Sequence, residues 1–230
     1  MLDFTKFEKK IGIKFNDLNL LQTAFTHRSY INEQKEKGLE HNERLEFLGD
    51  AVLELVSTRH LFDKFPAESE GVLTSYRSAL VNTNSLLAVA KKLKVNDFLL
   101  LSKGEKKDIG RARTFIMADA VEAIIGAIYL DRGYAAAQKF IADNFLCNTD
   151  EVVRKSLWQD AKSHFQEKAQ EIEKTTPLYK VLKEIGPDHN KQFQVGVFLE
   201  KQLIAKGKGV SKQEAEQEAA KEGLKIKEWS

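Results

Sequence analysis

Four acidic residues form a stripe on the helix predicted for HNERLEFLGDAVLELV, residues 41–56. Spacings of three, four and four residues place them within about 80° of one another on a helical wheel: Glu43, Glu46, Asp50 and Glu54. Leucines and valines occupy the other side of the helix. Like-charged neighbours at these spacings cost about 0.2–0.5 kcal/mol per pair. The stripe is therefore either a solvated polar face or a place where a cation gathers carboxylates.

A second acidic pair lies in an otherwise apolar run, TFIMADAVEAIIGAIYL, residues 114–130. Asp119 and Glu122 are its only charged residues, and their spacing of three places them on one helical face. An unpaired carboxylate buried there would cost several kcal/mol, so we expect a cationic group to face them.

Each of these two helices also contains a glycine, Gly49 in the first and Gly126 in the second. A glycine inside a helix costs about 1 kcal/mol relative to alanine, which indicates a close helix crossing rather than a direct catalytic role. Such a crossing would turn four carboxylates toward one another: Glu46, Asp50, Asp119 and Glu122. Oxygen ligands without Cys or His favour Mg²⁺ or Mn²⁺ over zinc. A site of this type typically activates water and stabilises charge on a phosphoryl group.

The elements that must position these residues are mainly helical. The chain has three prolines, where average usage would give about eleven. Apolar residues recur at helical spacing in residues 3–11, 42–64, 70–93, 115–130 and 135–146. These patterns predict an all-helical domain over residues 1–147.

The rest of the chain has a different pattern. Residues 148–158 are polar and weakly periodic, which is typical of a linker. A helix over 160–174 is then followed by three short segments that we interpret as antiparallel strands: LYKVLKEIG, KQFQVGVFLE and QLIAKGKG. Ser211 is the expected N-cap of a last helix that packs through its alanines. The predicted order over residues 159–228 is α-β-β-β-α.

Composition sets further limits. With 230 residues and 42% hydrophobic content, the chain can bury a core. The longest apolar run is short for a bilayer crossing and contains two acids, so we expect no membrane association. A single cysteine, Cys147, and an amino terminus without a secretory signal pattern predict a reducing compartment, the cytoplasm. The net charge of +2 is too small to indicate a nucleic-acid partner by itself.

The segment HNERLEFLGDAVL resembles the signature of the ribonuclease III family of double-strand-specific endoribonucleases. The similarity extends to FTHRSY (25–30), EGVLTSYRSALVN (70–82), LSKGE (101–105) and ADAVEAIIGAIYLD (118–131). From about Asp160 to Lys225 the chain resembles a double-stranded-RNA-binding domain. The resemblance implies a catalytic and dimerisation domain over 1–147, a linker over 148–158 and an RNA-binding domain over 159–228.

The resemblance also implies roles for single residues. Glu46, Asp50, Asp119 and Glu122 match the metal ligands of the family, with Asp50 and Glu122 most closely tied to hydrolysis. Glu43 and Glu70 match acids near the RNA strand, whereas Glu54 matches no site. Family members are homodimers that use Mg²⁺, or Mn²⁺ in its place, and no organic cofactor. They cut double-stranded RNA to 5′-phosphate and 3′-hydroxyl ends with short 3′ overhangs, in ribosomal RNA precursors and in other structured transcripts, including messenger and transfer RNA.

A basic patch precedes the last helix. Residues 201–212 contain four lysines and no acid, a composition that suits phosphates but also an ordinary solvated hairpin. By resemblance, five residues belong to the RNA-binding surface: Lys162, Ser163, Gln166, His189 and Lys212. The family commonly has a second basic residue after Lys212, where this chain has Gln213.

Two other classes of function are compatible with parts of the pattern. A non-catalytic RNA-binding or scaffold protein would keep the fold but should have lost metal ligands, and all four acids are present. A metal-dependent phosphohydrolase of small molecules leaves the RNA-binding tail unexplained. The sequence therefore favours a metal-dependent endonuclease that acts on double-stranded RNA.

Overall fold

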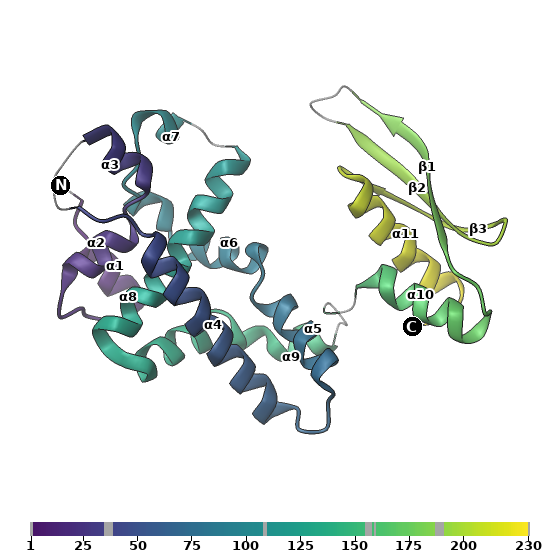
Figure 1. The fold of residues 1–230 in the computed structure, drawn as a ribbon, viewed down its shortest axis with the longest axis horizontal. Coiled ribbons are helices and arrows are strands. Elements are labelled where there is room, and N and C mark those ends of the chain that lie inside the picture. The colour runs from purple at the N-terminus through teal and green to yellow at the C-terminus, as the bar shows by residue number, and fades with distance from the viewer. Residues whose placement is uncertain are drawn as a thin grey trace. The chain divides into compact units, whose positions relative to one another are not determined.

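The computed structural model describes residues 2–34, 39–107, 110–154, 158, 160–186 and 191–229. It divides into two compact units, Met1–Trp158 and Gln159–Ser230 (Figure 1). Each unit has its own hydrophobic core. Within the described ranges, no helix has the length and apolar character needed to cross a membrane.

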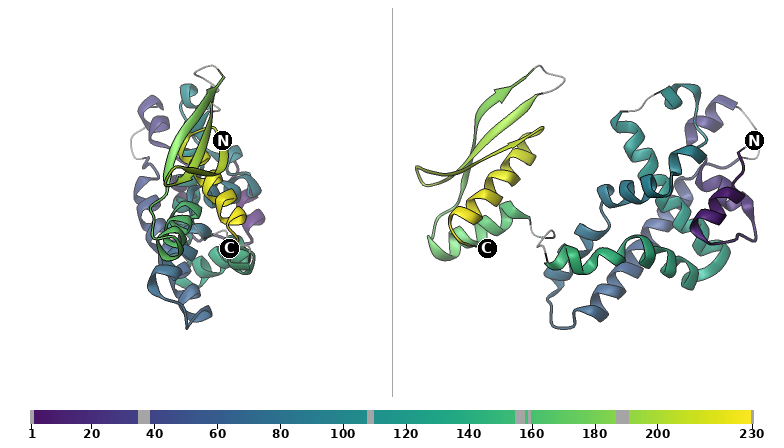
Figure 2. Two further views of the ribbon diagram at one scale, coloured as in Figure 1. Left: turned by 90° about the vertical axis from the view of Figure 1, so that its right-hand side faces the viewer. Right: turned by 180° about the vertical axis from the view of Figure 1, so that it is seen from behind.

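The first unit is built from helices, as Figures 1 and 2 show. Its central pair consists of α4 (Glu43–Lys64) and α8 (Arg111–Asn144). The other α-helices are α1 (Thr5–Ile11), α2 (Leu18–Ala24), α3 (Arg28–Gln34), α5 (Glu70–Leu80), α6 (Thr83–Lys92), α7 (Lys103–Lys107) and α9 (Thr149–Arg154). The described part of this unit also contains two 3₁₀ turns, η1 (Val95–Phe98) and η2 (Leu146–Asn148). The prediction of a mainly helical first domain is confirmed.

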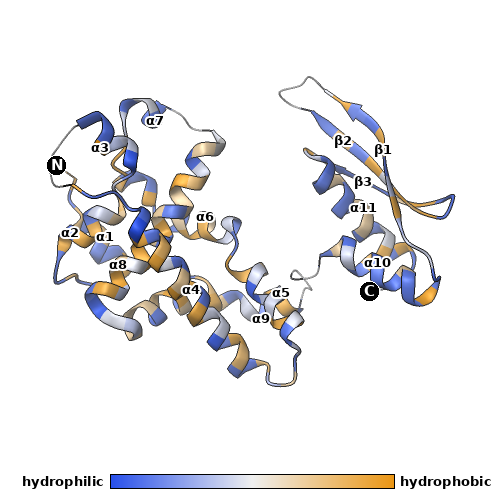
Figure 3. Cartoon of the chain, viewed as in Figure 1, coloured by the Kyte–Doolittle hydropathy of each residue, from blue (hydrophilic) through white to orange (hydrophobic). Residues whose placement is uncertain are grey.

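The crossing of α4 and α8 depends on the two glycines. A Cβ atom on Gly49 would lie 1.7 Å from the carbonyl oxygen of Glu122, and one on Gly126 would lie 2.2 Å from that of Leu45. Because only a missing side chain leaves room for such an approach, the two backbones are in direct contact. Hydrophobic stretches on both helices, orange in Figure 3, surround this contact and include the fully buried Ile124. The predicted close crossing is confirmed.

One helix boundary differs from the sequence expectation. The segment 70–93, expected as one helix, is two helices, because the side chain of Asn82 accepts a hydrogen bond from the Ser85 amide (3.0 Å) and so caps α6. The break expected between the helices 115–130 and 135–146 is confirmed: within α8, Gly133 has non-helical backbone angles, with left-handed φ (79°), and the helix is kinked there. The short helices α2, α3 and α7 were not predicted.

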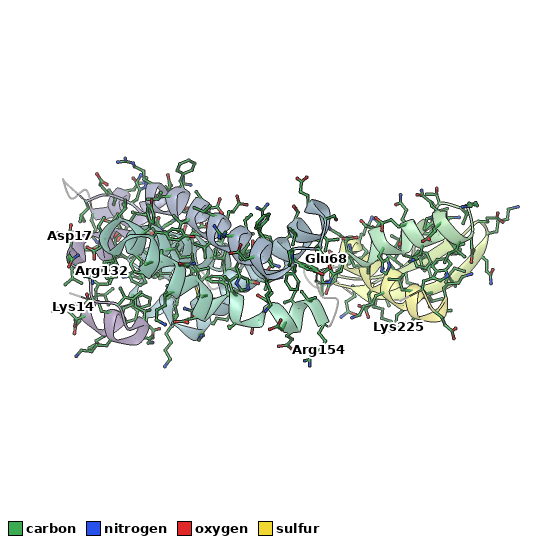
Figure 4. All side chains as sticks on the ribbon, turned by 90° about the horizontal axis from the view of Figure 1, so that it is seen from below. Lys14, Asp17, Glu68, Arg132, Arg154 and Lys225 are labelled. Atoms are coloured by element: carbon green, nitrogen blue, oxygen red, sulfur yellow. The ribbon has the colours of Figure 1, made fainter. Side chains whose placement is uncertain are left out.

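A set of hydrogen bonds, here called the polar clasp, connects Asn16 and Asp17, before α2, to Asp131 and Arg132, next to the kink of α8. The carboxylate of Asp131 accepts hydrogen bonds from the backbone amides of Asn16 and Asp17, both at 2.8 Å. The Arg132 guanidinium donates to the side-chain oxygen of Asn16 at 2.9 Å. Figure 4 labels Asp17 and Arg132 at the same end of the first unit. The clasp holds the amino-terminal helices against the central pair.

The stretch expected as a linker is in part packed structure. Helix α9 lies inside it, and Lys64 Nζ of α4 forms an ion pair with Asp150 at 2.7 Å. Val152, Val153 and Trp158 pack against the core of the first unit. These apolar side chains therefore add to the first core, and the linker over 148–158 stays a prediction.

The second unit has the predicted α-β-β-β-α order. Helices α10 (Ala161–Ile172) and α11 (Lys212–Ile226) flank strands β1 (Leu178–Ile185), β2 (Gln192–Leu199) and β3 (Gln202–Gly209). The sheet is antiparallel in the order β1-β2-β3, with Val197 opposite both Tyr179 and Ala205. Both helices contribute to the core, through Phe165 and Ala169 of α10 and three buried residues of α11: Ala219, Ala220 and Leu224. Ser211 caps α11 by accepting from the Glu214 amide at 3.1 Å, as predicted.

Candidate metal centre and nucleic-acid interface

Three carboxylates converge where α4 crosses α8. Glu46, in the first turn of α4, and Asp119 and Glu122 of α8 each offer an oxygen within 4.8 Å of the others. We call these three residues the carboxylate cluster. The spacing of three turns both α8 acids to one face, and the glycine contact brings the amino-terminal part of α4 close enough to add Glu46. This donor set contains oxygen atoms alone, so the chemistry fits Mg²⁺ or Mn²⁺.

Asp50 lies one turn beyond Glu46 on α4 and is exposed. It is not one of the three residues of the cluster, but its charge raises the pKa of Glu46 and of Glu122. Three of the four predicted ligands thus meet, and the fourth lies within electrostatic reach.

The protonation of the cluster reflects burial and mutual repulsion. Burial, followed by the charges of Asp50, Asp119 and Glu46, raises the pKa of Glu122 to about 8. Burial also raises the pKa of Asp119, and burial together with neighbouring acids raises that of Glu46. Although Asp50 is exposed, partial loss of its contact with water raises its pKa, followed by the charge of Glu54. Each of these shifts disfavours the ionised form, and a bound divalent cation would reverse that preference.

The remaining predicted acids lie outside the cluster. Glu43, at the start of α4, faces two basic groups: Arg28 Nη1 at 3.6 Å and His41 Nδ1 at 3.8 Å. Glu70 is exposed in the first turn of α5, and Glu54 is exposed on α4. No partner for Glu43 was predicted from the sequence. Arg28 and His41 were missed, although His41 stands two residues before it.

The FTHRSY and LSKGE segments, which carry part of the resemblance, support the start of α4. Thr26 forms an isolated parallel bridge with Leu100, and the Asn42 amide donates to the Thr26 carbonyl at 2.9 Å. The Ser102 amide donates to Ser29 Oγ at 3.2 Å, and His27 Nδ1 lies 2.8 Å from the same hydroxyl. His27 therefore has the structural hydrogen bond expected for it, and burial lowers its pKa.

The predicted RNA-binding residues of the second unit differ in their contacts. Ser163 and Gln166 are exposed on α10. Lys162, in contrast, is half-buried: its Nζ pairs with Glu216 Oε2 at 2.6 Å and lies 5.0 Å from the centre of the Tyr179 ring. This ammonium group thus joins α10 to α11.

The lysine patch is accessible at the start of α11. Lys212 is exposed; its Nζ lies 3.9 Å from Glu184 Oε1 and 5.7 Å from the centre of the Phe193 ring. Lys201, Lys206 and Lys208 are exposed on and beside β3. His189 lies outside the described residues.

Two family models match the chain, one for each unit. Residues 17–149 match the model described as Ribonuclease-III-like, and residues 161–227 match the Double-stranded RNA binding motif. The chain belongs to the ribonuclease III family. The first match contains the carboxylate cluster, and the second contains Lys162, Ser163, Gln166 and Lys212.

Relatives named Ribonuclease 3 are similar to the chain along most of its length. The protein from Leptospira interrogans is 46% identical over 217 residues, which is 94% of this chain and 87% of the relative. The protein from Carboxydothermus hydrogenoformans is 47% identical over 219 residues, covering 95% and 93% of the two chains. The similarity therefore includes both units.

Solved structures of the ribonuclease III nuclease domain from Campylobacter jejuni resemble the first unit. One is 42% identical with a TM-score of 0.56 and covers 63% of this chain and 99% of that domain. Another is 43% identical with a TM-score of 0.55 and covers 63% and 97%. The former is described as having structural flexibility in a region involved in dimer formation.

Gln213 marks a departure from the ribonuclease III pattern that can be tested. It is exposed beside Lys212 in the first turn of α11, where a lysine would add a phosphate contact. We expect Gln213→Lys to tighten binding to an RNA duplex and to steepen the slope of log K against log salt by about 0.9. The measurement is a salt titration of duplex affinity. Gln138→Lys adds the same charge at an exposed position of α8 and is the matched control. Equal slopes for wild type and Gln213→Lys would contradict the prediction.

Proposed function

We propose that Glu46, Asp50, Asp119 and Glu122 hold Mg²⁺, for which Mn²⁺ can substitute, and that this centre hydrolyses the phosphodiester bonds of double-stranded RNA. The chain is an endoribonuclease of the ribonuclease III family. The observation that carries the proposal is the convergence of three carboxylates at the α4–α8 crossing, in a chain that also has a double-stranded-RNA-binding motif. Residues 1–147 form the catalytic and dimerisation part and 159–228 the RNA-binding part of this proposal.

A divalent cation in this centre would supply an activated water and stabilise negative charge on the phosphoryl oxygens. The side chains of the protein hold the cation in place. The rigid helix α8 keeps Asp119 and Glu122 in register, and the crossing keeps Glu46 opposite them. Asp50 and Glu122 are the groups that we assign to the hydrolytic step itself. The oxygen of water bonds to phosphorus as the bond to the 3′ oxygen breaks, which leaves a 5′-phosphate and, after protonation, a 3′-hydroxyl.

We also infer that the working form is a homodimer. Large apolar side chains are exposed on the central helices: Phe47 (81%), Leu55 (58%) and Phe62 (66%) on α4, and Leu130 (55%) on α8. A second copy of the chain would cover them, and two centres would then cut the two strands with a short 3′ overhang. A sedimentation mass of a single chain would contradict the dimer.

The biological setting belongs to the same proposal. The single cysteine, which is exposed, suits the reducing cytoplasm. Structured transcripts, such as ribosomal RNA precursors, are the double-stranded substrates available there.

The direct test is incubation of the purified protein with a long RNA duplex, with and without Mg²⁺, beside a single-strand control. Shortening of the duplex that requires Mg²⁺, with the single strand intact, is the expected result. Binding without cutting would instead favour a non-catalytic scaffold protein.

The raised pKa of Glu122 gives a prediction for metal removal and pH. Between the ordinary value of 4.5 and about 8, this carboxyl is protonated in the folded, metal-free protein and ionised in the unfolded chain. Unfolding then releases protons, so the free energy of unfolding falls as pH rises through this window. Cation binding requires the ionised form, so Mg²⁺ should bind up to about tenfold more tightly per pH unit between pH 6 and 8.

Calorimetric titration with Mg²⁺ in two buffers of different ionisation enthalpy measures both the affinity and the released proton. Glu122→Gln, which cannot titrate, is the control. A pH-independent affinity without proton release in the wild type would contradict the prediction.

A further inference from the structure

Trp158 is the last residue of the first unit, and its ring packs against a row of aromatic side chains. Its ring lies edge-on to Tyr76 of α5, with centroids 4.9 Å apart and an interplanar angle of 78°. Tyr76 in turn contacts Phe65 edge-on at 5.1 Å and is only 4% exposed. Trp158 is therefore attached to a fixed part of the first core, beyond the end of α9.

The second unit begins almost immediately afterwards. Asp160, two residues on, caps α10 by accepting from the Ser163 amide at 2.8 Å, and it also accepts from Gln217 Nε2 of α11. An extended chain covers at most about 3.6 Å per residue, so the Cα atoms of Trp158 and Asp160 are within about 7 Å of each other. Among the residues that the structure describes, the one that precedes Trp158 is Arg154, the last residue of α9. Removal of the ring contact would move the anchored end of the tether back toward this helix. The tether to Asp160 would then have up to six residue steps and could reach about 20 Å.

We propose that Trp158 is a positioning residue: by docking on Tyr76 it sets the length of the tether between the nuclease unit and the RNA-binding unit. The reason for setting this length rests on the proposed function, because both units would have to bind the same RNA duplex. For two linked binding modules, effective concentration falls roughly as the −3/2 power of tether length. If the tether lengthens from two residue steps to six, the effective concentration of one unit at the RNA bound by the other falls about fivefold. Tyr76 lies on α5, the helix that also carries Glu70. Trp158 therefore docks on the helix of an acid that is predicted to lie near the RNA strand.

The alternative is that Trp158 only fills space on the surface of the first core. The two roles differ in what the second unit does when the ring is removed. Loss of space filling lowers the stability of the first unit and leaves the distances between the units unchanged. Loss of the anchor widens the range of those distances.

The test is a distance measurement between spin labels by pulsed electron resonance. Cys147, the single and exposed cysteine, carries one label, and Lys221→Cys on exposed α11 carries the other. Labelled chains are diluted with an excess of unlabelled Cys147→Ser chains, so that a dimer contains one labelled chain. We expect the distance distribution to be narrower with Trp158 and with Trp158→Phe, which keeps an aromatic ring, than with Trp158→Ala. Equal widths for Trp158 and Trp158→Ala would overturn the proposal.

A kinetic measurement on the full-length chain tests the purpose of the anchor. For a duplex long enough to contact both units, Trp158→Ala should raise KM about fivefold with kcat nearly unchanged, and Trp158→Phe should restore KM. An unchanged KM would overturn the role in RNA engagement. The distance measurement requires no cleavage, so a protein that fails to cut duplex RNA would refute the proposed function and leave the anchor to be judged by the distance widths.

Discussion

Replacing Glu122 by glutamine is expected to abolish cleavage of double-stranded RNA and to leave RNA binding nearly intact. Glutamine has nearly the shape of glutamate but cannot carry a negative charge, so the carboxylate cluster loses one of its three carboxyl groups. Removing one group that stabilises developing charge typically costs about 10²–10³-fold in kcat, and loss of a metal ligand should cost at least on the order of 10³-fold. Glu122 lies in the first unit, whereas Lys212 and the exposed residues of α10 belong to the second.

Glu54→Gln is the matched control. It makes the same chemical change on the same acidic stripe of α4, but Glu54 is exposed and outside the cluster. Its effect on activity should be small, because Glu54 acts on the centre only through the pKa of Asp50. Single-turnover cleavage gives the rate, and a filter-binding titration without metal gives the affinity. An equal loss of binding and cleavage in Glu122→Gln would contradict this division of labour between the units.

The parts of this protein that could be predicted from sequence are those set by local periodicity. The three-residue spacing of Asp119 and Glu122 fixes their common face whatever surrounds the helix. Their apolar neighbours indicated burial, which the structure confirms for Val121 and Ile124, both fully buried. A glycine in each helix predicted the crossing, because its cost in helix stability needed a compensating contact.

Contacts between distant segments were not predictable in this way. The ion pair that Lys162 forms with Glu216, 54 residues later, is one example. Trp158 lies in a polar stretch, and its partner Tyr76 comes from α5. The break before α6 has a local cause. The apolar spacing continues through residues 70–93, but the side chain of Asn82 caps α6, so a new helix begins there. Side-chain capping thus prevailed over periodicity at that point.

Replacing Gly49 by alanine is expected to destabilise the first unit and to disrupt the centre with it. The added methyl group would lie 1.7 Å from the Glu122 carbonyl oxygen and 2.9 Å from the Gly126 amide nitrogen, and both are backbone atoms that cannot rotate away. The helices must separate, at a typical cost of about 1–3 kcal/mol for overpacking, partly offset by the roughly 1 kcal/mol that alanine contributes to helix propensity. Since the displaced backbone carries Glu122 itself, a shift of about 1 Å could lower activity on the order of 10²-fold.

Gly71→Ala separates this steric effect from a general effect of glycine replacement. Gly71 is exposed in α5, and a Cβ atom there would meet nothing within 4 Å. The same substitution should therefore leave the stability unchanged or raise it by up to about 1 kcal/mol, because alanine favours the helix and restricts the unfolded chain. Urea unfolding compares the two variants, and cleavage assays well below the unfolding transition compare their activity. If Gly49→Ala were less stable yet fully active there, the crossing would hold the fold without setting the geometry of the carboxylates; if it were as stable as Gly71→Ala, the backbone contact itself would be refuted.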